Sequence, residues 1–256
     1  MKTISFKRLN WALQQINSKF VFRDKQQSKF MRLLSIVLFF VKGFIKSFWT
    51  QLGNIIYVPS ELWINSEEKI SFSEFISHNQ LPAWLTAPPI HEASHFFQRQ
   101  LASFFKIKYI FSFKSRYQYE LEAYTVTLMV NLFADNSDIL ILNRNYELLG
   151  EQFEHSSIYR IMQNLSGPNY LYANPNKRKV FANLETNLNL LIQKYLNLTE
   201  NIKFESPVLN RFWDLCKDLY GIDPTLQIKY VSLYSELNSV TYQVLTDTLL
   251  EGRRNK

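Results

Sequence analysis

The stretch PIHEASHFFQ, residues 89–98, contains the pattern H-E-x-x-H, in which His91 and His95 flank Glu92. Positions four apart lie on the same face of a helix, so both imidazoles can offer a nitrogen to one metal ion. Glu92 projects from an adjacent direction and can reach a water on that metal rather than the metal itself. The pattern predicts a zinc site on a helix, with Glu92 as general base. The alternative is an amphipathic helix that carries two surface histidines.

The residues around this pattern favour a helix. Thr86 can cap its start, and Pro88 and Pro89 suit a first helical turn, where a backbone N–H is not needed. No Gly or Pro follows before Phe105, and apolar residues recur at helical spacing from Ile90 onward. We therefore expect a helix that runs from Thr86 to Phe105.

The composition is that of a folded protein. The 256 residues are 46% hydrophobic and 16% aromatic and include only 6 glycines, which a mostly disordered chain would not show. The single cysteine, Cys216, excludes an internal disulfide framework and a Cys-rich zinc ribbon. The sequence has no Gly-rich phosphate loop and no G-x-S-x-G elbow, so it lacks the usual signs of nucleotide hydrolysis and of an α/β-hydrolase.

The positive charge is concentrated near the N-terminus. The formal net charge is +7, and residues 1–50 hold ten Lys or Arg residues against Asp24 alone. Such a segment favours an anionic partner, for which we consider a membrane surface, a virion component or nucleic acid. No recognised nucleic-acid motif accompanies the charge, so we expect no specific nucleic-acid partner.

Residues 31–51 carry a broad apolar face with lysines opposite, which predicts an amphipathic helix. The uninterrupted apolar run ends at Lys42 and is short for a membrane span. No small-residue cleavage site of a secretory signal follows it. Two interpretations stay open: the helix packs on the body of the protein, or it lies on a membrane surface with its lysines outward.

A catalytic zinc ion normally takes three protein ligands and a water, so a third ligand must come from outside the first helix. The segment RYQYELEAY, residues 116–124, opens a second expected helix that runs to about Leu132, and it holds the first acidic residues after Glu92. Glu120 is the preferred ligand and Glu122 the alternative. The two carboxylates point in different directions on a helix, so only one of them can face the metal.

An H-E-x-x-H pattern followed by a helix with E-x-x-A resembles the gluzincin branch of zinc metallopeptidases. The extended pattern adds IYVP at residues 56–59, Gln98, YELEAY at 119–124 and LSG at 165–167 with Tyr170, and it is similar to small peptidases encoded by bacteriophages. The resemblance covers residues 54–175. It implies zinc ligands at His91, His95 and Glu120. The aspartate that supports a ligand in this family falls on Tyr124 here, which is a departure from the pattern.

The resemblance also implies the fold and the chemistry. The expected fold is α+β and predominantly helical, with a zincin-like core of two ligand helices and a short strand or small sheet. The expected activity is hydrolysis of a peptide or amide bond by a zinc-activated water, with Zn2+ as cofactor and Glu92 as general base. A donor to the developing oxyanion is usual in such sites. Tyr170 is the candidate and His155 the alternative, although each is more often structural.

Three regions follow from these assignments: a basic amphipathic helical arm at 1–53, a catalytic core at 54–175, and a helical region at 176–256 packed on the core. Residues 54–59 predict a strand against which an extended peptide could lie, and residues 106–113 predict a strand or an extended connector. Further helices are expected at 71–77, 146–154, 157–165, 177–196, 208–219 and 230–250.

The favoured function is therefore a zinc-dependent metallopeptidase that acts on a peptide or protein substrate. The alternative is a non-enzymatic protein with an inactive zincin fold, which associates with a membrane or a virion through residues 1–50. Either function is compatible with a cytoplasmic or virion-associated protein or with one held at the periphery of a membrane. Two other polar residues could serve the site: Gln98, one turn beyond His95, could contact substrate, and Arg116 could bind a substrate carboxylate or form a surface pair with Glu122.

Overall fold

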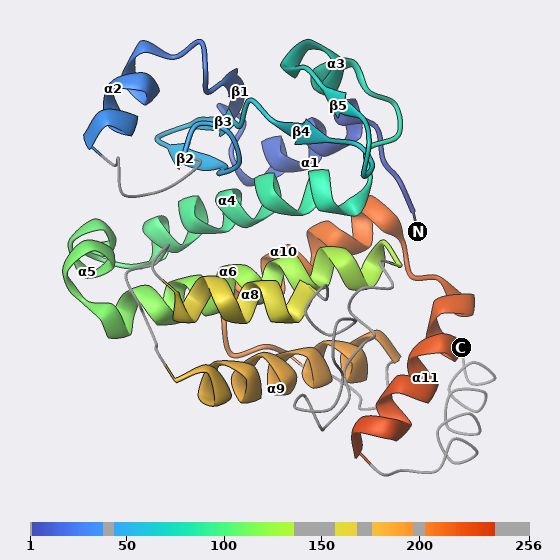
Figure 1. Cartoon of the computed structure of the whole chain (residues 1–256). Helices are drawn as coiled ribbons and strands as arrows, with labels where there is room; N and C mark the ends of the chain where they lie inside the picture. The colour runs from blue at the N-terminus through green and yellow to red at the C-terminus, as the bar shows by residue number, and fades with distance from the viewer. Residues whose placement is uncertain (1, 38–43, 136–156, 168–175, 197–202, 239–256) are drawn as a thin grey trace.

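The computed structural model describes residues 2–37, 44–135, 157–167, 176–196 and 203–238 (Figure 1). Most of these residues lie in helices and a few form small sheets, which confirms the predicted α+β, predominantly helical class. The helix expected at 146–154 and the last part of the one expected at 230–250 lie outside the described residues.

Two long antiparallel helices, α4 (Ala83–Leu101) and α6 (Phe113–Phe133), form the centre of the molecule and pack extensively on each other (Figure 1). Both helices bury apolar side chains on several sides, as a helix in the middle of a core must. The second helix expected after residue 116 is thus present as α6.

Further helices cover the centre on one side. Helix α10 (Pro207–Tyr220) packs on α6 and α4, and α9 (Lys177–Leu196) packs on α6. Helices α8 (Ser157–Ser166) and α11 (Pro224–Asn238) both pack against α9. The helices expected at 157–165, 177–196 and 208–219 are therefore confirmed to within one residue at each end.

A three-stranded sheet lies on the other side of α4, with strand order β1-β3-β2 (Figure 1). Strand β1 (Val21–Asp24) pairs in parallel with β3 (Ile55–Val58), and β2 (Thr50–Leu52) pairs with β3 in antiparallel fashion. The predicted strand at 54–59 is confirmed as β3, but it is the central strand. The sheet edge that contacts α4 beside the H-E-x-x-H pattern belongs to β2 instead.

The N-terminal residues contribute to this same core. Helix α1 (Phe6–Ile16) is capped by Ser5 and packs on α4, on α10 and on α3 (Phe72–Ser77), which confirms the helix expected at 71–77. Its residues Leu9, Ala12 and Leu13 are fully buried. A two-stranded sheet of β4 (Leu62–Trp63) and β5 (Lys69–Ile70) connects the main sheet to α3.

The amphipathic segment at 31–51 differs from the single helix that its pattern predicts. Helix α2 spans Lys29–Val37, residues 44–47 form turns, and Thr50 already belongs to β2. Pairing of Thr50 with Tyr57 satisfies the backbone in the sheet, which the local apolar pattern could not reveal. Among the described helices, none is both long enough and apolar enough to cross a membrane.

Helix α4 begins one turn earlier than predicted. Its N-cap is Pro82, and Pro88 and Pro89 lie inside the helix rather than in its first turn. Two intrahelical hydrogen bonds are missing at these prolines because they have no N–H. Thr86 does not cap the helix: its hydroxyl donates to the carbonyl of Ala83 and lies 2.7 Å from the hydroxyl of Tyr220. Burial of this turn against α10 stabilises a helix that proline would otherwise weaken.

The predicted strand or extended connector at 106–113 is wrong, because residues 105–111 form helix α5. A short segment with partial alternation does not distinguish a strand from a helix. Tertiary contacts decide here: Phe105 and Tyr109, one helical turn apart, stack on each other and face α4. Helix α4 ends at Leu101 and not at Phe105, because Phe104 takes a left-handed conformation with φ of 59°.

Candidate metal centre

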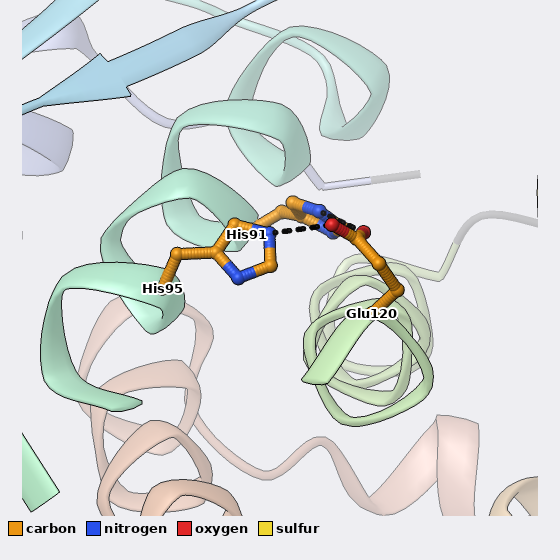
Figure 2. Close-up of side chains that lie close together, drawn as sticks. All are labelled: His91, His95 and Glu120. Atoms are coloured by element: carbon orange, nitrogen blue, oxygen red, sulfur yellow. Dashed lines mark ion pairs between the residues drawn. The ribbon is translucent and has the colours of Figure 1, made fainter. Parts of the chain in front are cut away.

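His91 and His95 extend from α4 toward α6, where Glu120 lies opposite them (Figure 2). The Nε2 atom of His91 is 3.5 Å from Oε2 of Glu120, and Nε2 of His95 is 3.4 Å from Oε1. The three ligand atoms all lie within 4.8 Å of one another. The spacing of four residues on α4 thus brings together the two histidines and the glutamate that the sequence singled out.

The imidazole of His95 is oriented by Gln98, one turn further along α4. Nδ1 of His95 is 2.8 Å from Oε1 of Gln98, whose Nε2 donates to Tyr119 O and to Oε2 of Glu122. Because the amide nitrogen is used as a double donor, the amide oxygen is the acceptor and Nδ1 of His95 carries the proton. When the imidazole is neutral, the lone pair of Nε2 is then directed at the cluster. Gln98 therefore orients the imidazole of His95.

The imidazole of His91 is oriented in a similar way by α6. Its Nδ1 is 3.2 Å from the hydroxyl of Thr127, which itself donates to Ala123 O. Nδ1 of His91 is therefore the donor in this contact, and its Nε2 is free to face Glu120. Tyr124 packs edge-on against the ring of His91, and its own hydroxyl accepts a hydrogen bond from Asn164. The support that the family resemblance places on Tyr124 comes from Thr127 instead.

The Glu120 carboxylate is buried and incompletely satisfied. Its Oε1 accepts a hydrogen bond from the hydroxyl of Tyr109 on α5. Its Oε2 is fully buried and accepts no hydrogen bond from the residues that the structure describes. A buried carboxylate oxygen without a donor is costly, and a divalent cation satisfies it. This oxygen and the two directed Nε2 atoms fit a metal ion with nitrogen and oxygen ligands.

The electrostatics of the metal-free cluster follow from the same contacts. Burial alone would lower the pKa of His95, but the charge and hydrogen bonding of Glu120 raise it from 6.5 to about 9. Burial alone would raise the pKa of Glu120, but the two histidines lower it below its ordinary value. Burial and the charge of Glu120 raise the pKa of Tyr109, so its hydroxyl stays protonated. The metal-free site is therefore an imidazolium–carboxylate pair that holds one proton.

Glu92 lies beside the cluster and is not part of it. The side chain is half-buried, and its Oε2 accepts a hydrogen bond from the backbone N–H of Gln51 on β2 at 2.9 Å. Lys25 is buried nearby and donates to Phe48 O and to the hydroxyl of Thr50, which fixes the chain that leads into β2. Burial lowers the pKa of Lys25 to about 8, although the negative charge of Glu92 acts in the opposite direction.

Glu122, the alternative third ligand, points away from the histidines. Its Oε1 accepts from the hydroxyl of Ser206, the N-cap of α10, and its Oε2 accepts from Gln98. The surface pair predicted between Arg116 and Glu122 is wrong. Arg116 is buried, and its Nε donates to Tyr109 O at the end of α5. Arg116 therefore holds α5 against α6 at the site.

Two predicted site residues lie outside the described residues, and three residues beside the cluster were not predicted. Tyr170 and His155, the candidate oxyanion donors, lie outside the described residues. Tyr109, Thr127 and Lys25 were not identified from the sequence as neighbours of the site. Thr127 follows Glu120 by two helical turns, so its place on the same face of α6 was available from spacing alone. Tyr109 had no such signal, because its segment did not look helical.

Comparisons of the chain with models of protein families, with curated proteins and with solved structures find no match. The geometry of the site therefore carries the functional argument.

Proposed function

We propose that the protein is a zinc-dependent metallopeptidase with a zincin-like core, in which His91, His95 and Glu120 bind the metal. The observation that carries the proposal is the convergence of two directed Nε2 atoms on a buried carboxylate whose Oε2 has no hydrogen-bond donor among the described residues. Two histidines and a glutamate are a common ligand set of catalytic zinc, which keeps one position open. The hydrogen bonds of Gln98 and Thr127 are the kind of support that zinc-bound histidines receive.

Zinc bound at this site supplies a Lewis acid that polarises a carbonyl oxygen and lowers the pKa of water. Glu92, which lies between His91 and His95 in the sequence and is half-buried, would act as the general base that takes a proton from the attacking water and passes it to the leaving amine. Tyr109 stays protonated and donates its hydroxyl hydrogen to Glu120, so it would bind a substrate oxygen by exchanging Glu120 for the substrate. In this proposal Tyr109 is a described candidate for the role that the sequence suggested for Tyr170.

The substrate in this proposal lies along β2. This strand is an edge of the three-stranded sheet and contacts α4 beside Glu92. An extended peptide can add to a free sheet edge through backbone hydrogen bonds. The edge at β2, rather than the central strand β3, is therefore where we expect peptide recognition.

The test measures zinc content and peptide hydrolysis in the same preparations. We expect about one equivalent of zinc in the wild type and hydrolysis of a quenched fluorescent peptide mixture that a chelator abolishes. Glu92→Gln should keep the zinc and lose activity by roughly 10²- to 10⁴-fold, as removal of a general base does. The matched control is Glu67→Gln, because Glu67 is exposed and remote from the cluster. It should leave both readouts unchanged.

Two results would contradict the proposal. The first is a folded wild-type protein that takes up no zinc even after reconstitution. The second is full hydrolytic activity in zinc-loaded Glu92→Gln. Zinc binding without hydrolysis of any peptide would favour the alternative, a non-enzymatic protein with an inactive zincin fold that associates with a membrane or a virion.

A further inference from the structure

Helix α5 and its flanking turns form the most exposed apolar region that the structure describes. None of the residues of α5 itself is buried. Six large apolar side chains in this region, each 53–80% exposed, make up what we call the α5 patch: Leu101, Phe104, Ile107, Ile110, Phe111 and Phe113. Folded proteins rarely leave such a set together in water without a binding partner.

The α5 patch is also cationic. No Asp or Glu occurs between Glu92 and Glu120. Three exposed lysines, Lys106, Lys108 and Lys114, alternate in sequence with the apolar residues of the patch. A surface of this composition attracts anions and repels no negatively charged partner.

Phe104 combines an unusual backbone conformation with an exposed side chain. Its φ of 59° is unusual for a bulky residue, and its side chain is 74% exposed. A strained conformation normally persists where packing compensates for it. Here the described structure buries little of the ring, so the conformation places an aromatic side chain in solvent at the turn between α4 and α5.

The face of α5 opposite the patch packs against the metal-binding cluster and α6. Phe105 and Tyr109 stack on each other and face His95, while Arg116 donates to the carbonyls of Tyr109 and Ile110. Helix α5 thus has an inner face that contacts the metal-binding cluster and an outer face without described packing. A partner can bind the outer face while the inner contacts remain.

We propose that the α5 patch docks the protein on an anionic lipid surface. Aromatic and aliphatic side chains enter the boundary between headgroups and acyl chains, while the neighbouring lysines reach lipid phosphates and carboxylates. The alternation of lysines with exposed aromatics, without acidic residues, matches this layer better than it matches the mixed charges of a protein surface. Lipid docking does not require zinc. If the proposed peptidase activity holds, docking places the site next to polypeptides at the membrane.

The test uses the full chain in a vesicle flotation assay. The vesicles contain either phosphatidylcholine alone or phosphatidylcholine with about one third phosphatidylserine. We expect the wild type to bind the anionic vesicles, with affinity that falls as salt is raised. Lys106→Gln combined with Lys108→Gln should weaken binding about 25-fold, at fivefold for each lysine. Phe104→Ser, Ile107→Ser and Phe111→Ser together should weaken binding by about tenfold or more.

Two control variants locate the contact. Ile228→Ser changes an apolar residue on α11 with 55% exposure and should bind like the wild type. Helix α2 has exposed apolar residues of its own, so Phe30→Ser combined with Leu33→Ser and Ile36→Ser tests the competing surface. Circular dichroism and the melting temperature establish that each variant is folded, and zinc content reports on the proposed peptidase site separately.

Three results would overturn the proposal. One is a wild type that floats with neither kind of vesicle. Another is binding that survives both α5 variants and is lost only in the α2 variant. The third is a dimer that the triple α5 variant converts to a monomer, because the patch would then be covered by a second copy of the chain.

Discussion

Helices α4 and α5 follow each other in the chain, with residues 102–104 between them, yet they differ in almost every physical respect. Helix α4 buries eleven of its 19 residues, including His91 and Gln98, whereas α5 buries none of its seven. Polar groups on α4 are held by partners within the helix and on other elements, and the outer side chains of α5 face solvent. The comparison separates residues whose positions are fixed by packing from residues that remain available for contact.

The largest expected effect on the buried side of this comparison is that of a substitution at Glu120. Glu120→Gln removes the negative charge that faces both histidines, and we expect zinc affinity to fall by more than about 100-fold, because loss of even a supporting hydrogen bond costs about 10- to 100-fold. Titration with a competing chelator measures the change. Glu122→Gln is the matched control, since its carboxylate faces Gln98 and Ser206. Equal losses in the two variants would contradict the assignment of Glu120 as the ligand.

The free energy of unfolding should also distinguish residues fixed by packing from the exposed residues of α5. Phe133 is fully buried on α6 against Tyr195 and Trp213, so Phe133→Ala should lower the free energy of unfolding by about 3–5 kcal/mol. Ile110→Ala on the outer face of α5 should change it by no more than about 0.5 kcal/mol. Chemical denaturation of the metal-free proteins measures both values. A large loss at Ile110 would show that the α5 patch is packed in solution.

The supporting hydrogen bonds on the buried side should have an intermediate effect. Gln98→Ala removes the acceptor of His95 Nδ1, and Thr127→Val removes the partner of His91. Each should weaken zinc binding by about 10- to 100-fold while retaining a stoichiometry of about one. Zinc affinity that stays within a factor of two in both variants would show that packing alone orients the imidazoles.

The pH dependence of zinc binding should show a modest effect for each pH unit. His95 has a pKa of about 9 in the metal-free protein, so zinc must displace a proton at neutral pH. Affinity should rise about tenfold for each pH unit from 7 to 9 and then level off. The raised pKa also means that the His95–Glu120 pair stabilises the metal-free protein fully below pH 6.5 and loses this contribution as pH rises through 9. Calorimetry in buffers of different ionisation enthalpy measures the proton release.

Much of the central geometry could be predicted because it depends on short-range spacing. The interval of four residues fixes His91 and His95 on one face of a helix, whatever that helix packs against. A second acid-bearing helix was expected at the right place, and the structure brings Glu120 to the cluster and directs Glu122 elsewhere. The central strand β3 was equally evident from its β-branched and aromatic run.

The errors occurred where contacts distant in sequence decide the structure. Thr86 has the chemistry of an N-cap, but its hydroxyl is used by Tyr220, which lies far along the chain. Residues 50–52 follow an amphipathic pattern but pair with β3. Helix α5 forms because Phe105 and Tyr109 reach the site, which no window of local sequence reveals. Arg116 was expected to bind a substrate carboxylate or to form a surface pair with Glu122, and it is buried, where it donates to the carbonyls of Tyr109 and Ile110.

The hydrogen bond between Glu92 and the N–H of Gln51 joins the proposed base to the strand along which substrate is proposed to lie. In the proposed mode of binding, a peptide that adds to β2 would offer its own carbonyl to this N–H and displace the carboxylate. Binding of substrate to Gln51 and release of Glu92 from Gln51 would then occur in the same step. In the proposed mechanism, the hydrogen bond from Gln51 holds Oε2 of Glu92 in the free protein, and the carboxylate would become available as a base when substrate binds.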